Sequence, residues 1–128
     1  HLIPEIQRQI NEGKRQLQLG NLTPKRDFIH TSDMAIAIRL LLDKFTAGID
    51  VFNLGRGIEY SVSEVVAAFE KQLGEKLEVI VDSARVRKVE RMHLLADISK
   101  LCRFTGWQPA ISLEEGIDTL IERAAVQR

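Results

Sequence analysis

The feature of this sequence that most constrains its fold is the alternation of helical and extended patterns. Two capping-box signatures, at 61–64 (SVSE) and 112–115 (SLEE), each precede apolar residues at helical spacing. The run 77–81 (LEVIV) between them is typical of a strand, and Gly74 marks the end of the preceding helix. Because helices and strands are intermixed, the sequence predicts a small mixed α/β fold.

Further elements follow from the same kinds of pattern. They are a helix from Pro4 to Gly13, a half-buried strand at 16–19, extended segments at 28–31 and 51–55, and a short helix from Asp97 to Gly106. With the elements above, we expect five helices and about four strands in one domain spanning residues 1–128.

The segment 35–42 (AIAIRLLL) is predicted to form a helix, and 31–33 (TSD) offers N-cap chemistry for it. Its apolar residues extend nearly all round the helix, whereas a surface helix shows a narrower apolar stripe. The helix is therefore expected either to be central to this domain or to pack against a partner absent from the chain.

The charge balance disfavours several classes of function. Eighteen basic and eighteen acidic residues give a formal net charge of zero, which argues against a general nucleic-acid or membrane-surface binder. No apolar run is long enough to span a membrane, and the start lacks the apolar core of a signal peptide. The single cysteine, Cys102, suits a reducing compartment, so we expect a cytoplasmic protein. The chain also lacks an initiator methionine, which predicts a fragment or a processed chain.

Motifs for cofactors, metals and catalysis are missing from the sequence. The segment 55–57 (GRG) follows an extended run but lacks the third glycine of a dinucleotide-binding loop, so we interpret it as a turn. Three histidines and Cys102 show no metal-ligand spacing, and we interpret Cys102 as a packed thiol. Tyr60 is followed four residues later by Glu64, not by lysine. We therefore expect no catalytic residue, no cofactor site and no metal site in this chain.

Basic residues near turns are the remaining candidates. Arg26 lies between two extended pieces, and the stretch 85–91 (RVRKVER) follows the strand at 77–81. Arginine at a strand end suits bidentate binding of phosphate, and a neighbouring carboxylate suits a pair of sugar hydroxyls. From the residue types alone, the alternative is that these basic residues belong to a solvated charged loop and bind no ligand.

The order of four short strings adds a resemblance. These are 20–28 (GNLTPKRDF), 52–55 (FNLG), 87–97 (RKVERMHLLAD), and 105–109 (TGWQP) followed by 112–116 (SLEEG). Together they resemble extended short-chain dehydrogenases/reductases acting on nucleotide sugars, above all the 4,6-dehydratases and 4-keto reductases of GDP-, dTDP- and UDP-sugars. The resemblance covers essentially the whole chain.

The resemblance implies that this chain is the C-terminal, substrate-binding lobe of a longer enzyme. That lobe would pack on an N-terminal Rossmann domain, absent here, which would carry NAD or NADP and a Tyr–Lys catalytic pair; the parent enzyme is expected to be a homodimer. Arg26 and Arg87 would hold the substrate diphosphate, Glu90 would accept hydrogen bonds from the ribose, and Asn21 would line the pocket.

Two departures from the family pattern concern the same site. Lys88 stands where the family usually has proline, and Glu5 stands where some dehydratases carry a phosphate-binding lysine. Glu5 would oppose an anionic ligand if it faced the site.

Three functions follow as hypotheses. The first is the substrate lobe of an NAD(P)-dependent nucleotide-sugar epimerase, dehydratase or reductase, inactive alone. The second is a non-catalytic nucleotide-sugar-binding or regulatory module. The third is a small nucleic-acid binder using 85–91, which zero net charge and few aromatic residues disfavour.

Overall fold

The structure, a computed structural model, describes residues 1–126 and confirms a small mixed α/β fold. In chain order the elements are α1 (Leu2–Asn11), β1 (Gln16–Leu19), β2 (Lys25–Asp27), α2 (Thr31–Lys44), β3 (Glu59–Ser61), α3 (Val62–Leu73), β4 (Glu78–Val81), the 3-10 helix η1 (Ser83–Arg85), β5 (His93–Leu94), α4 (Ser99–Thr105) and α5 (Leu113–Val126). Five α-helices and five strands thus lie within the described residues.

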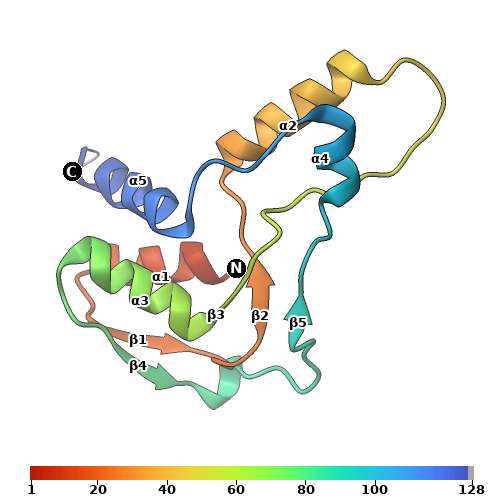
Figure 1. The fold of residues 1–128 in the computed structure, drawn as a ribbon. Helices are drawn as coiled ribbons and strands as arrows, with labels where there is room; N and C mark the ends of the chain where they lie inside the picture. The colour runs from red at the N-terminus through yellow and green to blue at the C-terminus, as the bar shows by residue number, and fades with distance from the viewer. Residues whose placement is uncertain (127–128) are drawn as a thin grey trace.

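Two small sheets organise these elements. Strands β1 and β4 pair in parallel, from Gln16 opposite Glu78 to Leu19 opposite Val81. In the other sheet β2 lies in the middle, antiparallel to β3 and parallel to β5. Figure 1 shows α1, α3 and α5 gathered beside the β1–β4 sheet, while α2 and α4 lie at the other end of the molecule. The sheet of β2, β3 and β5 lies between these two groups.

Each group of helices has its own hydrophobic core. The core beside β1 and β4 contains Ile6, Leu17, Val65, Phe69 and Ile117, each almost completely buried. The second core is smaller and is built from Ala37 of α2, Leu101 of α4 and Trp107. Apolar residues of α1, β1, α3 and α5 thus lie in the core, as their predicted periodicities indicate.

The local signals at α3 act as the sequence predicts. The Ser61 hydroxyl accepts a hydrogen bond from the Glu64 N–H at 3.2 Å, and Glu64 Oε2 accepts one from the Ser61 N–H at 2.6 Å. The helix ends at Gly74, whose φ of 68° is the left-handed conformation that glycine adopts without strain. The short helix ending at Gly106 is confirmed as α4.

The free edge of β1 is closed by a side chain that sequence analysis did not identify. Gln9 of α1 is 1% exposed, and its amide oxygen accepts from the Gln18 N–H at 2.9 Å. Its amide nitrogen donates to the Gln18 carbonyl at 3.0 Å. The side chain thus makes the two hydrogen bonds that a neighbouring strand would make, and it fixes α1 against the sheet.

Three local predictions are wrong. The extended segment predicted at 28–31 is displaced to β2, where Lys25–Asp27 pair with two neighbouring strands, and Thr31 already begins α2. Residues 51–55 form no strand, because no strand of the described chain pairs with them. The N-cap of α2 is His30 rather than 31–33, since its Nδ1 accepts from the Ser32 N–H at 3.1 Å.

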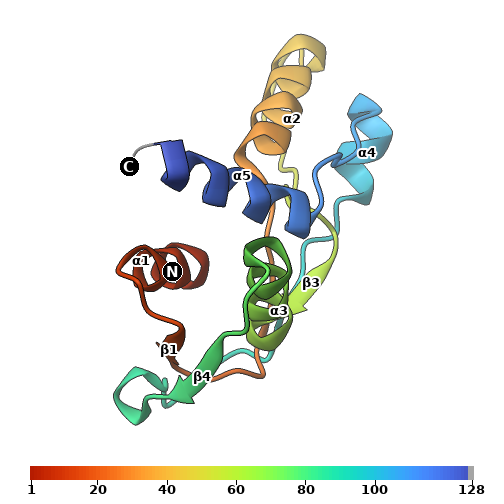
Figure 2. The ribbon, with the colours of Figure 1, turned by 90° about the vertical axis from the view of Figure 1, so that its left-hand side faces the viewer.

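Helix α2 exposes much of its apolar surface. Only Asp33 and Ala37 are buried, whereas Ile36 is 53% and Leu42 is 75% exposed. Figure 2 shows the helix extending away from α1 and α3. Within the described residues, α2 is therefore not central to the domain, and the partner predicted for it stays a prediction. No helix among residues 1–126 has the length and apolar character needed to cross a membrane.

Candidate functional site

The centre of the candidate site is an ion pair between β2 and the loop before β5. Arg26 Nη2 donates to Glu90 Oε1 at 2.7 Å, and Nη1 donates to the Arg91 and Lys25 carbonyls, each at 2.7 Å. The pair is largely enclosed, with 27% of the Arg26 side chain and 17% of the Glu90 side chain exposed. The structure thus brings together two residues that are 64 positions apart and were both predicted for the site.

The Arg26 guanidinium retains binding capacity in this arrangement. Three of its five N–H groups donate to Glu90 and to the two carbonyls, which leaves two N–H groups without a partner in the described residues. The two that remain, one on Nε and one on Nη2, can each donate to a phosphate oxygen in a charge-assisted hydrogen bond. Glu90 Oε2 likewise forms no hydrogen bond in the described residues, so it can accept one from a ligand hydroxyl.

Asp27, the residue after Arg26, binds main-chain groups rather than a cation. Its carboxylate accepts from the N–H groups of Arg56 at 2.8 Å, Gly57 at 2.9 Å and Ala96 at 3.4 Å. The segment 55–57 is therefore a turn, as predicted, and two of its N–H groups are engaged by this carboxylate. Sequence analysis gave Asp27 no role, although two glycines around one residue signal a close main-chain approach.

A cleft of about 480 Å³ opens beside Arg26. It is lined by Arg26, Asp27, Ile29, 52–55 and 94–96. The lining combines the Arg26 cation and the Asp27 carboxylate, which is occupied by three main-chain N–H groups, with apolar walls and with the extended segment 52–55. These properties suit an anionic ligand that also carries a ring to pack against the walls.

The two other predicted site residues do not contact this pair. Arg87 is exposed and makes no hydrogen bond or ion pair within the described residues. The Asn21 side-chain oxygen accepts from the Thr23 N–H at 3.3 Å and from the Thr23 hydroxyl at 3.0 Å, which stabilises its own turn. The roles of Arg87 and Asn21 in ligand binding stay predictions.

Glu5 is engaged by arginines of this chain. It accepts hydrogen bonds from Arg8 at 2.8 Å and from Arg85 at 3.0 Å, and Gln9 donates to the same carboxylate. The Arg8 hydrogen bond, followed by that from Gln9, holds the pKa of Glu5 well below its usual range. Two cations therefore balance the negative charge of Glu5, which would otherwise oppose an anionic ligand.

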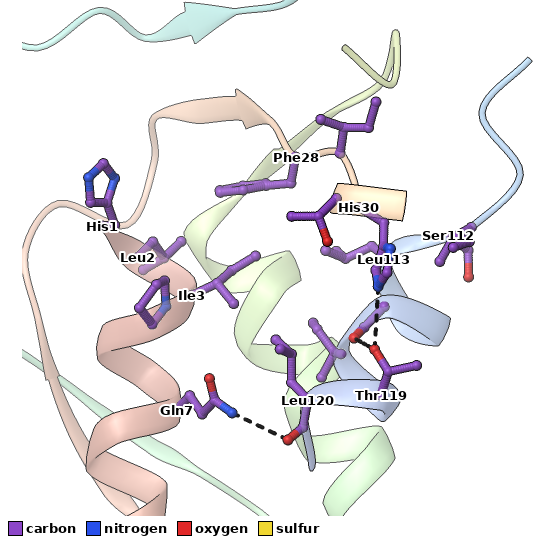
Figure 3. Close-up of a pocket in the computed structure, with 16 residues that line it drawn as sticks. His1, Leu2, Ile3, Gln7, Phe28, His30, Ser112, Leu113, Thr119 and Leu120 are labelled. Atoms are coloured by element: carbon purple, nitrogen blue, oxygen red, sulfur yellow. Dashed lines mark hydrogen bonds between the residues drawn. The ribbon is translucent and has the colours of Figure 1, made fainter. Parts of the chain in front are cut away.

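A second pocket, of about 440 Å³, lies between the start of α1 and α5 (Figure 3). His30 and Thr119 point toward each other at one side of it, with His30 Nε2 3.5 Å from the Thr119 hydroxyl. Its walls are otherwise mainly apolar, and no Lys, Arg, Asp or Glu lines it among the described residues. A pocket without a fixed cation is poorly suited to a diphosphate, so the Arg26 cleft is the better candidate for one. No cluster of potential metal ligands occurs among the described residues.

Comparisons with known proteins agree on one group of relatives. A family model described as GDP-mannose 4,6 dehydratase matches residues 1–120. GDP-L-fucose synthase 1 of Arabidopsis thaliana is 30% identical over 122 residues, covering 91% of this chain and 36% of the relative. GDP-L-fucose synthase of Escherichia coli strain K12 is 28% identical over 130 residues, covering 91% of this chain and 40% of the relative.

A solved structure gives the same result for the fold. The UDP-glucose 4-epimerase of Bifidobacterium longum, solved in complex with NAD+ and UDP, matches with a TM-score of 0.87 and 25% identity. The match covers 98% of this chain and 39% of that protein. The chain therefore spans between 36% and 40% of the length of these three relatives. The matches confirm the resemblance indicated by the sequence motifs.

Proposed function

Because this chain belongs to the GDP-mannose 4,6 dehydratase family, we propose that it is the substrate-binding lobe of an NAD(P)-dependent nucleotide-sugar epimerase, dehydratase or reductase. The observation that carries the proposal is the Arg26–Glu90 pair: Arg26 lines the cleft and retains unused guanidinium donors, and its partner Glu90 retains a free carboxylate oxygen. A nucleoside diphosphate presents the matching groups, since its phosphates accept hydrogen bonds and its ribose hydroxyls donate them.

In this proposal each site residue has a distinct role. Arg26 donates its two remaining N–H groups to a phosphate oxygen, and Arg87 moves its exposed guanidinium to the same diphosphate. Glu90 keeps Oε1 on Arg26 and accepts from the ribose through Oε2. Asn21 lines the nucleotide pocket from the turn after β1. A charge-assisted hydrogen bond contributes about 1.5–3 kcal/mol, so each arginine accounts for about ten- to a hundredfold in affinity.

The chemistry of the whole enzyme would be supplied outside this chain. NAD or NADP, when bound, would transfer a hydride at a sugar carbon. The glycine turn 55–57 gives two of its N–H groups to Asp27, which leaves it poorly suited to hold a cofactor phosphate. The exposed apolar residues of α2, among them Ile36 and Leu42, support packing against a separate cofactor-binding domain.

Titration of nucleotides into the full-length protein tests the proposal. Arg87→Ala should weaken binding of GDP or UDP, whichever binds more tightly, by about ten- to a hundredfold, and Arg87→Lys should restore only part. Arg91→Ala is the matched control, because Arg91 is exposed on the same loop and contacts Arg26 only through its carbonyl. Unchanged affinity in Arg87→Ala, or an equal loss in Arg91→Ala, would refute the shared diphosphate site.

Glu90 has its own test. Glu90→Gln should weaken ribonucleotides more than the corresponding 2′-deoxyribonucleotides, because only the former offer the full hydroxyl pair. An equal loss for both kinds of nucleotide would contradict the ribose contact.

A further inference from the structure

Asp27 joins three segments that meet at the Arg26 cleft. Its hydrogen-bond partners Arg56 and Gly57 are 29 and 30 residues away in sequence, and Ala96 is 69 residues away. All three partners are main-chain N–H groups, so the carboxylate fixes the path of the chain and not a side chain. Ala96 lines the cleft, and Arg56 directly follows the lining segment 52–55.

The packing around this carboxylate is tight. A Cβ atom added at Gly55 would lie 2.7 Å from Asp27 Oδ2 and 2.7 Å from the Ala96 Cβ. Both distances are far below ordinary contact, so the three segments approach as closely as a glycine allows. The side chain of Arg56 is engaged elsewhere, since its Nη1 donates to the Ile111 carbonyl at 2.7 Å.

Arg26 depends on the same piece of chain. It precedes Asp27 in the three-residue strand β2, and its side chain is held by the loop that leads into β5 and Ala96. A shift of Asp27 would therefore move strand β2, which carries Arg26. It would also move Ala96, which follows the loop that holds the Arg26 side chain. Hydrogen bonds from a guanidinium to phosphate are sensitive to displacements of this kind.

We propose that Asp27 is a positioning residue for nucleotide-diphosphate binding, acting through Arg26. The carboxylate holds the end of β2 against 55–57 and Ala96, and so fixes the position of Arg26 at the cleft that it lines. Asp27 itself does not contact the ligand. This inference rests on the proposed function, because Asp27 can position Arg26 for a nucleoside diphosphate only if Arg26 binds one.

A double-mutant cycle on the full-length protein tests the inference, with GDP and UDP as probes. Asp27→Asn should weaken binding of the better probe about tenfold in the otherwise unchanged protein, but less than about twofold when Arg26→Gln is already present. A residue that only stabilises the fold would have the same effect in both backgrounds. Gly55→Ala, which retains the carboxylate but displaces it, should show the same dependence on Arg26 and serves if Asp27→Asn does not fold.

Asp33→Asn is the matched control. Asp33 also accepts from two main-chain N–H groups, of Ala110 and Ile111, but lines neither pocket. It should change affinity less than about twofold at a temperature where each variant is folded. Equal effects of Asp27→Asn in both backgrounds, or an effect no larger than that of Asp33→Asn, would overturn the inference. If Arg26→Gln alone leaves affinity unchanged, the proposed diphosphate site itself fails and Asp27 has no residue to act through.

Discussion

Replacing the buried Asp33 with alanine should lower the free energy of unfolding by about 3–5 kcal/mol. Asp33 is 2% exposed and lies in the first turn of α2. Its carboxylate accepts from the Ala110 N–H at 3.1 Å and from the Ile111 N–H at 2.9 Å, which fixes the segment before α5 to the start of α2.

The magnitude follows from these contacts. A hydrogen bond to a charged group is worth about 1.5–3 kcal/mol, and alanine would remove two such bonds and leave two N–H groups without a partner. A negative charge in the first turn adds about 0.3–1 kcal/mol through its attraction to the helix N-terminus. Together these contributions amount to about 3–7 kcal/mol, and water entering beside the smaller side chain would recover part of this, which leaves a net loss of about 3–5 kcal/mol.

Chemical denaturation followed by circular dichroism measures this loss. Asp43→Asn is the control, because Asp43 is exposed on the same helix and its substitution should change stability by less than about 0.5 kcal/mol. Asp33→Asn should be intermediate, since the amide oxygen can still accept one N–H. A loss below about 1 kcal/mol in Asp33→Ala, or a loss as large in Asp43→Asn, would refute the reasoning.

Three further variants test separate parts of the fold. Gly55→Ala should destabilise the chain by about 1–3 kcal/mol through the clash with Asp27, and a melting temperature equal to that of the unchanged chain would contradict this. Gln9→Ala should cost about 2 kcal/mol and speed hydrogen exchange at the Gln18 amide, so unchanged exchange there would refute the capped edge of β1. The fold lowers the pKa of Glu5, so its contribution to stability is complete above its ordinary pKa of 4.5 and is lost as the pH falls. As the pH falls from about 5 to about 3, the free energy of unfolding of Glu5→Gln should therefore decrease less than that of the unchanged chain. An equal decrease in both, measured by denaturation at each pH, would contradict this role of Glu5.

The parts of the fold that sequence predicts well depend on neighbouring residues. The capping box of Ser61 and Glu64 and the glycine end of α3 involve atoms a few positions apart, so their chemistry is visible in the sequence. The segment 51–55 has the apolar composition of a strand but forms none, because strand formation needs a partner that composition cannot supply. Strand β2 shows the reverse case. Its residues Lys25–Asp27 are polar, so composition does not indicate a strand there, but two neighbouring strands pair with them.

The same distinction applies to the candidate site. The motif resemblance selected Arg26 and Glu90, and the structure places them 2.7 Å apart. Spacing could not reveal Asp27 as a junction, because its partners come from segments 29 to 69 residues away. Asp33 offers a related lesson: its position suggests an N-cap, but its carboxylate binds N–H groups 77 and 78 residues away, and His30 caps the helix instead.

A crystal structure of the full-length protein with a bound nucleoside diphosphate tests the central claim most directly. The account predicts phosphate oxygens within about 3.2 Å of the Arg26 and Arg87 guanidinium groups, and a ribose hydroxyl within the same distance of Glu90. It also predicts that Asp27 keeps its main-chain hydrogen bonds and stays out of contact with the nucleotide. A nucleotide bound elsewhere, with Arg26 and Arg87 directed to opposite surfaces, would contradict the account.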